Sequence, residues 1–407
     1  MSDTADQLLA YPFKGEACPY DVPAGYKHLQ EKGPINRVTF LDGSEGWVVT
    51  GHEEARALLS DPRISADRSN PNFPQTAKYA PGMPPVTTND PMPREERTFS
   101  YMDGEEHSSQ RRLVIPSFTV RQVKAMRPLM QQVADELIDK MVATGSPVDL
   151  ISAYAAPFSP TMLTHILGIP EAEREFFQQR VQSLAAPMEH MMPALLDLAG
   201  YLPGLLEKKT AEPGQDLLSS LVSRSEDGTA ELTPQNLLNT TMLVLISGNE
   251  SSMTMISLGV LALLDNPEQL AAFRANPELA PSLVQELLRY LSVGGSALRV
   301  ATEDIEIGDR LIRAGEGVVI GIKAANRDPK AFPDPEALDV RRGDNQHIAF
   351  SHGPHTCVAQ NFATALLETA FTTLFARLPE LRLAVPREEL PVGGMGLWRV
   401  TELPVTW

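Results

Sequence analysis

The residues Ala349-Phe350-Ser351-His352-Gly353-Pro354-His355-Thr356-Cys357-Val358-Ala359-Gln360 set one cysteine behind a loop of glycine, proline and histidine, immediately before a strongly helical stretch. The chain has two cysteines, and the other is Cys18 near the N-terminus. A zinc cage of four cysteines is therefore impossible. No paired cysteine and histidine spacing of the zinc-finger kind is present, and a disulfide framework is not expected in a chain this long.

Two interpretations of Cys357 follow from its position. The amides and the dipole at a helix N-terminus favour a thiolate, and a thiolate is one of the few axial ligands that proteins offer to haem iron. The alternative is a buried, inert cysteine, since unpaired cysteine is among the most buried residue types. The rest of the sequence has to decide between the two.

Composition describes an ordinary globular protein. The 407 residues are 43% hydrophobic and 21% charged, which is enough to bury a large core. A net charge of −17 argues against nucleic acid or an anionic membrane as a partner of the whole surface. Residues 1–6 do not resemble a signal peptide, and no run approaches the ~18 apolar residues of a membrane span. We expect a cytoplasmic protein that is a monomer.

The N-terminal part predicts a hairpin, a helix and a long loop. Strands are expected over 37–41 and 46–50, around the favourable turn Asp42-Gly43. Thr50-Gly51-His52-Glu53 resembles a capping box that opens a helix through about Ser60. Residues 65–103 are rich in proline, and a loop of this length is usually a functional lid or disordered. We favour the lid.

A helix is expected from about Gly104, with His107 and Arg111 one turn apart on the same face. Taken alone, such a pair is more often a solvated surface feature than a ligand-binding pair. Further helices are predicted over 120–145, 148–168 and 171–209. The last of these is rich in methionine, which suits either a deformable binding wall or simple core packing.

The longest predicted helix has Thr233 as its N-cap and Pro234 as its first residue, and it runs to about Asp265. Its middle is almost entirely apolar except for the polar island Ser247-Gly248-Asn249-Glu250-Ser251-Ser252. A carboxylate inside a buried helix is unfavourable unless it is used or paired. We therefore expect a functional role for Glu250 and Ser251.

The C-terminal part predicts short elements around two further helices. A helix over 282–290 carries Glu286 and Arg289 on one face, which by itself is the commonest kind of helical ion pair. A small sheet is expected within 298–320, an apolar helix after Cys357, and a hairpin in 391–407. Neither an internal repeat nor a break in composition marks a second domain.

The order of three motifs resembles one known family. They are Gly248-Asn249-Glu250-Ser251, then Glu286-Leu287-Leu288-Arg289, then a Phe-x-x-Gly-x-His-x-Cys motif from Phe350 to Cys357. This order resembles the cytochrome P450 family of haem-thiolate enzymes, and the N-terminal part and tail look closest to its soluble actinobacterial members. The resemblance covers essentially the whole chain. It implies a mainly α fold with small β-sheets (α+β), a long central helix over the haem, and a single haem domain over residues 1–407.

The resemblance also implies a role for each matching residue. Cys357 would be the axial ligand of haem b iron, where its charge favours O–O cleavage. Glu250 and Ser251 would deliver protons to bound dioxygen. Glu286 and Arg289, completed by Arg342, would hold the fold rather than perform chemistry. The remaining haem contacts that it implies are Phe350 and Gly248, together with four residues at positions that bind the propionates: His107, Arg111, Arg299 and His355.

The sequence departs from the family pattern at four positions. Ser351 and Ala359 replace glycines of the cysteine loop, but both residues are small, so the haem should still fit. Thr364 stands where arginine is common, which bears on a propionate or redox-partner contact. The largest departure is Ser251 in place of threonine. Serine keeps the hydroxyl but lacks the methyl that restricts its rotamer, so we expect some uncoupling to peroxide.

The function expected is a monooxygenase that oxidises a small organic, natural-product-like substrate of secondary metabolism with O2. A chain of 407 residues leaves no room for a fused reductase. The resemblance therefore implies electrons from a ferredoxin and an NAD(P)H-dependent ferredoxin reductase, docked on a basic surface that includes Arg111 or Arg112. The alternative is nitric-oxide chemistry, either reduction or aromatic nitration. The retained Glu250 argues against reduction. A haem-based gas sensor is a third possibility, but no output domain is visible.

Overall fold

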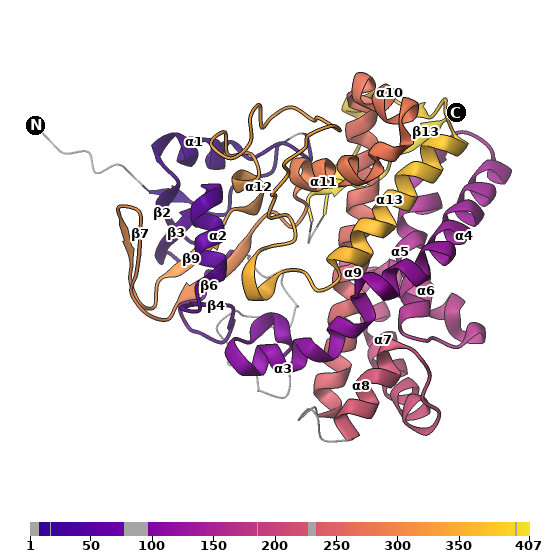
Figure 1. The fold of residues 1–407 in the computed structure, drawn as a ribbon, viewed down its shortest axis with the longest axis horizontal. Coiled ribbons are helices and arrows are strands. Elements are labelled where there is room, and N and C mark those ends of the chain that lie inside the picture. The colour runs from indigo at the N-terminus through magenta and orange to yellow at the C-terminus, as the bar shows by residue number, and fades with distance from the viewer. Residues whose placement is uncertain (1–7, 17, 77–96, 185, 227–232, 395–396) are drawn as a thin grey trace, which may run out of the picture. The chain divides into compact units, whose positions relative to one another are not determined.

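The computed structural model describes residues 8–16, 18–76, 97–184, 186–226, 233–394 and 397–407 (Figure 1). The chain forms two compact units, each assembled from segments that are far apart in sequence. Unit 1 consists of Met1–Ser108, Gly294–Ala337 and Gln346–Cys357, and unit 2 of Ser109–Val293, Leu338–Asn345 and Val358–Trp407. Helices make up 56% of the structure, which confirms the mainly α fold with small sheets. A single haem domain over residues 1–407 stays a prediction.

Unit 1 is built on a six-stranded sheet. β2 and β3 form the predicted antiparallel hairpin, with Val38 opposite Gly46, and Gly43 takes the positive φ of 86° that suits its turn. The predicted sheet within 298–320 is also confirmed, since β6 pairs with β9, and β7 (Ile305–Ile307) pairs with β8 (Arg310–Ile312). The strand order is β1 (Leu9–Ala10), β2 (Ile35–Thr39), β3 (Glu45–Val49), β9 (Gly317–Ile320), β6 (Ala297–Ala301) and β4 (Ile64–Ser65).

Alternate residues of the central strands supply two separate cores of unit 1, as expected when successive side chains point to opposite faces of a sheet. Val49 and Ile320 cluster with residues of α2 (His52–Ser60). Val48 and Val319 cluster instead with Tyr26 and Leu29 of α1 (Ala24–Lys32) and with Ala324 of α12 (Ile322–Ala325). The sheet is therefore covered by helices on both faces.

The helix predicted after Thr50 forms, but the predicted capping box is wrong. α2 begins at His52 and has Gly51 as its N-cap. No side-chain hydrogen bond from the N-cap position caps this helix. The Thr50 hydroxyl instead donates to the carbonyl of Pro34 at 3.4 Å. The amide of His52 donates to Oδ2 of Asp328 at 2.9 Å. A carboxylate from a distant segment thus satisfies a helix-terminal amide that a local cap was expected to take.

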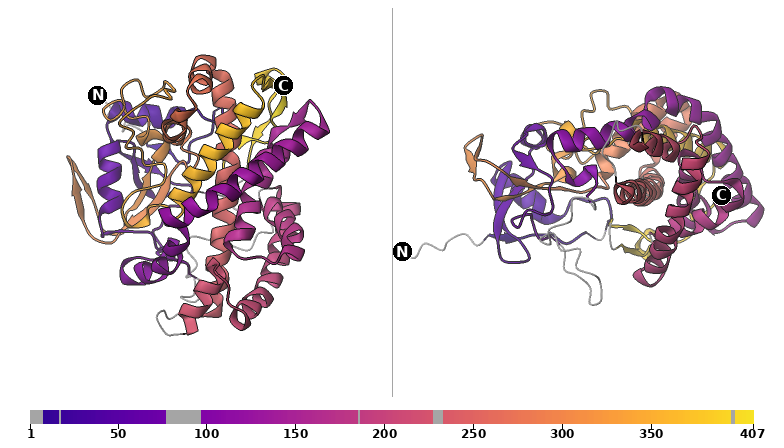
Figure 2. Two further views of the ribbon diagram at one scale, coloured as in Figure 1. Left: turned by 45° about the vertical axis from the view of Figure 1, so that its right-hand side comes forward. Right: turned by 90° about the horizontal axis from the view of Figure 1, so that it is seen from below.

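Unit 2 is a set of helices packed on α9 (Pro234–Asp265). α5 (Ala156–Ile166), α11 (Ala280–Leu291) and α13 (Gln360–Arg377) contact it, and Figure 2 shows α13 running beside α4 (Val120–Thr144). The other helices of unit 2 are α6 (Arg174–Ser183), α7 (Met188–Ala211), α8 (Leu217–Glu226) and α10 (Pro267–Ala275). α3 (Gly104–Val114) begins where the sequence predicted.

Both ends of α9 match the prediction. A capping box opens the helix: Thr233 Oγ1 accepts from the Asn236 amide at 3.0 Å, and the Thr233 amide donates to Oδ1 of Asn236 at 3.2 Å. The helix ends at Asp265, so its 32 residues span about 48 Å at ~1.5 Å per residue. Every residue from Ser252 to Leu263 is buried, so this stretch of the helix is covered on all sides and is mostly apolar.

The continuous helix predicted over 148–168 is interrupted. β5 (Val148–Asp149) pairs with β13 (Pro404–Thr406), a π-helical turn covers Ile151–Ala155, and α5 follows. The Asp149 carboxylate accepts from the amides of Ile151 and Ser152, each at 3.1 Å. These bonds start the helical turn after the strand. The helix predicted over 171–209 is likewise divided into α6 and α7.

Short sheets close the C-terminal part of unit 2. β10 (Arg382–Leu383) and β5 flank β13. β11 (Val392–Gly393) and β12 (Arg399–Val400) form the hairpin predicted within 391–407, with Val392 opposite Val400.

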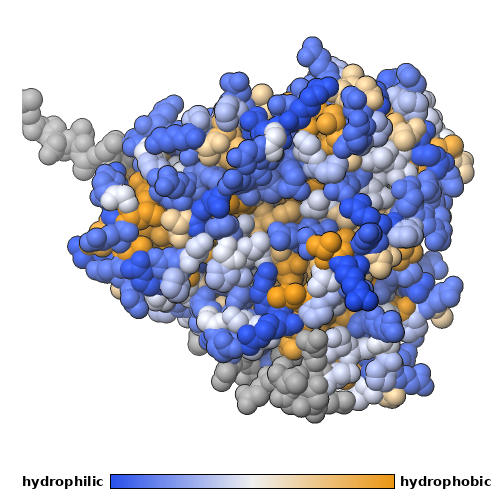
Figure 3. All heavy atoms as spheres, viewed as in Figure 1, coloured by the Kyte–Doolittle hydropathy of each residue, from blue (hydrophilic) through white to orange (hydrophobic). Residues whose placement is uncertain are grey.

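Residues 77–96 of the predicted lid lie outside the described residues. Among the residues that are described, no helix has the length and apolar character needed to cross a bilayer. Figure 3 shows hydrophilic side chains over most of one face of the molecule, with smaller hydrophobic groups between them.

Candidate functional site

The Cys357 loop is held by a series of backbone hydrogen bonds within unit 1. The Cys357 amide donates to the Phe350 carbonyl at 2.8 Å, and the Thr356 amide donates to the Gly353 carbonyl at 3.1 Å. Gly353 has φ 68°, and an added Cβ would lie 2.4 Å from the Leu59 carbonyl oxygen. Only glycine fits there. α13 has Ala359 as its N-cap and begins at Gln360, so the half-buried Cys357 precedes the helix rather than lying in its first turn.

A cluster of charged and aromatic side chains surrounds Asp103 in the same unit. The His355 Nε2 atom lies 3.3 Å from Oδ1 of Asp103, and the rings of His107 and His355 are 4.2 Å apart between centroids. Ser65 Oγ and the Ala66 amide also donate to Asp103. Burial tends to raise the pKa of Asp103, but the hydrogen bonds from His355, Ser65 and Ala66 outweigh it and lower the pKa below its usual range.

Arg299 adds a cation whose charge is poorly compensated. Its Nη1 atom donates to the carbonyl of Leu298 at 2.8 Å. Burial lowers its pKa, although the negative charge of Asp103 acts in the opposite direction, and Arg68 lowers it further. Among the residues that the structure describes, no carboxylate forms an ion pair with Arg299. Within the described part of the chain, this half-buried guanidinium therefore has no carboxylate in ion-pair contact, and Asp103 is the acid whose charge acts on it.

These donors fit a haem group. Cys357 would offer a thiol to the iron, and the half-buried Arg299 and His355 with the buried His107 would offer donors to propionate carboxylates. Arg111 follows His107 by one turn on α3, as the sequence predicted. Asp103 and Arg68 were not identified from the sequence. The only signal for Asp103 was its position just before the helix, where acidic residues are favoured.

The acid and alcohol residues lie on α9 in unit 2. Oε1 of Glu250 accepts a hydrogen bond from the Leu397 amide at 3.2 Å, and the Ser251 hydroxyl donates to the carbonyl of Ser247 at 2.5 Å. The neighbouring Asn249 is buried and donates to the carbonyl of Val181 at 2.7 Å. An added Cβ at Gly248 would meet only Leu163, at 3.5 Å or more, so packing among the described residues does not by itself require glycine there.

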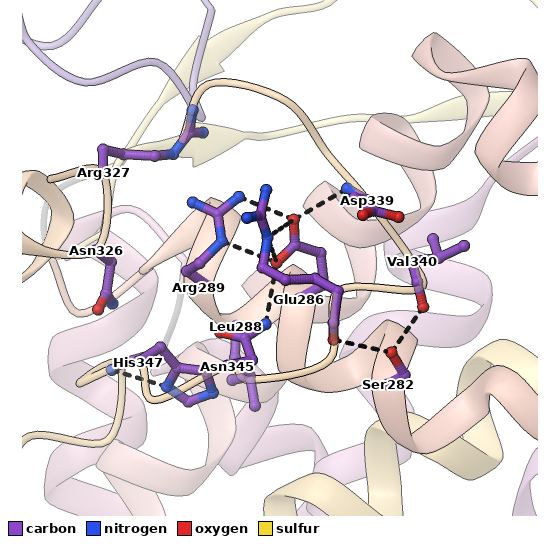
Figure 4. A network of polar contacts seen from close by, with 12 residues as sticks. Ser282, Glu286, Leu288, Arg289, Asn326, Arg327, Asp339, Val340, Asn345 and His347 are labelled. Atoms are coloured by element: carbon purple, nitrogen blue, oxygen red, sulfur yellow. Dashed lines mark hydrogen bonds and ion pairs between the residues drawn. The ribbon is translucent and has the colours of Figure 1, made fainter. Parts of the chain in front are cut away.

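Glu286 is the centre of a buried ion-pair network, as the sequence predicted (Figure 4). Its carboxylate accepts from Nε and Nη2 of Arg289, both at 2.8 Å, and from Nε of Arg342 at 3.1 Å. The Asp339 amide and the Asn345 side chain donate to it at 2.9 and 3.0 Å. Glu286 and Arg289 are fully buried. The network joins α11 to residues 339–345, and it therefore has a structural role.

Known proteins resemble this chain in sequence and in structure. The family model described as Cytochrome P450 matches residues 205–379. The chain is 43% identical to the Vitamin D3 dihydroxylase of Streptomyces griseolus, over 100% of both sequences. It is also 43% identical to the pentalenic acid synthase of Streptomyces avermitilis, over 98% of this chain and 97% of the relative. The crystal structure of cytochrome P450 MoxA from Nonomuraea recticatena matches with a TM-score of 0.90 and 41% identity, over 98% of each chain.

Proposed function

Since this chain belongs to the cytochrome P450 family of haem-thiolate monooxygenases, we propose that Cys357 binds the iron of haem b and that the enzyme oxidises a natural-product-like molecule with O2. The observation that carries the proposal is the structured loop of unit 1 that holds Cys357, in the same unit as the under-compensated Arg299 and the paired rings of His107 and His355. A haem bound through a thiolate activates O2 and favours O–O cleavage.

The chain's own residues hold that group and handle its charges. Arg299, His107 and His355, with Arg111 on the next turn of α3, neutralise the propionates. Phe350 would contact the haem next to the thiolate, and its carbonyl accepts a hydrogen bond from the Cys357 amide. Gly248 leaves room beside α9, because an added Cβ would approach only Leu163.

Glu250 and Ser251 supply protons. Glu250 is a carboxylate that can take up and release a proton within hydrogen-bond reach of its neighbours. Ser251 donates to Ser247 within its own helix, so it has to rotate before it can donate elsewhere. Serine lacks the methyl that restricts this rotation in threonine. We expect oxygen use in the wild-type enzyme to be incompletely coupled to product.

The test of the iron ligand is the shifted Soret band of the ferrous–CO complex. Cys357→Ala and Cys357→His should abolish this band, while Cys18→Ala, which removes the other cysteine, should leave it intact. Survival of the band in the Cys357 variants would refute the proposal. Product formation that requires O2 then tests the oxygenase activity, and Glu250→Ala should depress it strongly.

The substrate is proposed to be a medium or large apolar natural product. Two relatives are named as a Vitamin D3 dihydroxylase and a pentalenic acid synthase. Within α7, Ala194, Leu198, Leu202 and Leu205 form the buried face, while the methionines at its start are only half-buried and can adapt to a ligand. Type I spectral shifts with vitamin D3, terpenoid acids and macrolides test this class. The absence of a shift with every apolar compound would contradict it.

Electrons are proposed to come from a ferredoxin and an NAD(P)H-dependent reductase, with Arg112 on the docking surface. Arg112→Glu should then lower turnover and weaken its dependence on ionic strength, while the ferrous–CO spectrum stays normal. Arg180→Glu, on the exposed side of α6, is the matched control. Unchanged turnover in Arg112→Glu would contradict the proposal that the redox partner docks on the surface around Arg112.

The nitric-oxide alternative is not favoured, because the chain groups with P450 monooxygenases over its full length. Formation of a product only when nitric oxide is added would support this alternative. A cytoplasmic location and a monomeric state stay predictions, and size-exclusion chromatography with light scattering tests the second.

A further inference from the structure

The side chain of Asn249 on α9 binds the C-terminal end of α6. Its Nδ2 atom donates to the carbonyl of Val181 at 2.7 Å, and the amide of Leu184 donates to the same carbonyl at 3.2 Å. Val181 lies in the last turn of α6, where the carbonyls lack the usual partner one turn further along the helix. Asn249 therefore caps α6 from a different helix.

The amide group of Asn249 is only half satisfied. The residue is 1% exposed, and its Oδ1 atom has no hydrogen-bond partner among the described residues. A buried acceptor without a partner is unfavourable, and a half-satisfied polar group is worse for stability than an apolar side chain of the same shape. Stability therefore does not explain the asparagine. Residues that break a packing rule in this way are expected where function requires them.

α9 is the fixed partner in this contact. The hydroxyl of Ser159 on α5 donates to the carbonyl of Gly248 at 2.9 Å, and Ser159 is fully buried. α5 also packs on α9. Because α5 holds this turn of α9 independently of α6, the bond from Asn249 sets where the end of α6 lies.

The same side of α9 carries an apolar side chain that its neighbours leave open. Ile246 precedes Asn249 by three residues, so the two lie near one face of the helix, and Ile246 is 42% exposed. α6 and α7 pack on each other and on α9. They form a wall on this helix, and Ile246 is available to an apolar ligand beside it.

We propose that Asn249 is a positioning residue that limits the size of the ligand. By capping α6 it holds the wall of α6 and α7 close to α9, and it therefore disfavours molecules that need this wall to move outward. The inference rests on the proposed function, because it takes an apolar substrate to bind against α7 and α9.

The first test measures the contact without a ligand or turnover. Hydrogen exchange of the Leu184 amide is followed by NMR on the ¹⁵N-leucine-labelled holoprotein in its diamagnetic ferrous–CO form. Asn249→Leu keeps nearly the same shape but has no donor. It should lower the protection of Leu184 by about fivefold to tenfold, the effect of one hydrogen bond. The midpoint of thermal unfolding should not fall, because the unpaired Oδ1 atom is removed together with the donor.

The matched control is Asn36→Leu. Asn36 also caps a helix from another element, since its Nδ2 atom donates to the carbonyl of Leu29 in α1 at 3.0 Å, but it belongs to unit 1. The protection of Leu184 should not change in this variant. Unchanged protection in Asn249→Leu, or an equal loss in Asn36→Leu, overturns the proposal.

The second test compares the dissociation constants of the largest and the smallest compounds that give a type I shift. Asn249→Leu should favour the largest compound over the smallest by about fivefold relative to the wild type, the effect of one hydrogen bond that no longer has to break. Asn36→Leu should leave this ratio unchanged.

The outcomes separate this inference from the proposed function. If both compounds respond equally to Asn249→Leu, or neither responds, the limit on size is refuted although the substrate class stands. If no apolar compound gives a shift with the wild type, the proposed substrate class fails and the limit on size fails with it. The exchange of Leu184 then still decides whether Asn249 caps α6.

Discussion

Ser351, at the start of the turn before Cys357, has φ 65°, in the left-handed region that disfavours side chains. Its hydroxyl oxygen is buried and has no hydrogen-bond partner among the described residues. Ser351→Gly should therefore raise the free energy of unfolding by about 0.5–1 kcal/mol, since relief of the backbone strain exceeds the added entropy of the unfolded chain.

Calorimetry on the holoprotein measures this effect as a rise of about 1 °C in the midpoint of thermal unfolding. Ser351→Ala is the control, because it removes the hydroxyl but keeps the Cβ. An equal gain in both variants would assign the effect to the hydroxyl rather than to the backbone.

Glu286 is the centre of the ion-pair network that joins α11 to residues 339–345. Its carboxylate binds Arg289 and Arg342, and replacement by Gln leaves the fully buried Arg289 without its counter-charge. We expect Glu286→Gln to lower the free energy of unfolding by about 3–5 kcal/mol and to reduce the yield of holoprotein.

Chemical denaturation monitored by circular dichroism checks this prediction. Arg180→Gln breaks the exposed ion pair with Asp197 and should have little effect, because exposed pairs contribute little. A similarly small effect of Glu286→Gln would show that the network is not needed for stability.

At the scale of elements, α2 shows how a helix can depend on a residue outside its own segment. The His52 amide donates to the Asp328 carboxylate at 2.9 Å, and hydrogen bonds to a charged acceptor contribute about 1.5–3 kcal/mol. Asp328→Ala should therefore destabilise the protein by roughly that amount. Thr50→Ala should have a smaller effect, because Thr50 does not cap the helix.

Hydrogen exchange of the first turn of α2 distinguishes the two variants. Exchange should accelerate in Asp328→Ala and change little in Thr50→Ala. Faster exchange in Thr50→Ala than in Asp328→Ala would instead support the local capping box that the sequence predicted.

At the scale of the whole molecule, three buried or half-buried histidines make stability depend on pH. Burial is the main cause that lowers the pKa of His52, His165 and His352 below the ordinary value of 6.5. The unfolded chain therefore binds these protons more readily than the folded chain. Stability that is fully present above pH 6.5 should be lost progressively as the pH falls below that value.

His52→Gln isolates one contribution. Its Nε2 atom lies 2.9 Å from the Gln346 carbonyl, and Gln keeps an N–H donor but cannot gain a proton. A proton on His52 is also unfavourable because this residue opens α2, where the helix dipole is positive. The fall in the thermal midpoint between about pH 7.5 and 5.5 should be smaller in this variant than in the wild type. Equal falls would exclude His52 as a contributor.

Much of the fold was predictable from the sequence because its signals are local. The capping box and Pro234 fix the start of α9, and Asn266-Pro267 fixes its end. Asp42-Gly43 fixes the first hairpin, and the glycines between β6 and β9 mark the small sheets. These residues act through the backbone of their own segment, so the neighbouring sequence is sufficient. The division of 148–168 was missed because Val148–Asp149 becomes a strand only by pairing with β13, more than two hundred residues later.

The sequence by itself determined the family, the three motifs in order and the identity of the cysteine expected to bind haem, since each depends on residue type and spacing. The tertiary structure alone decided which groups meet: Asp103 with His355, Asp328 with the start of α2, and the Leu397 amide with Glu250. Charged groups and backbone amides are satisfied by whatever the fold brings within about 3 Å. The cysteine loop therefore indicates the chemistry from sequence, whereas the contact between Glu250 on α9 and the β11–β12 hairpin forms only on folding.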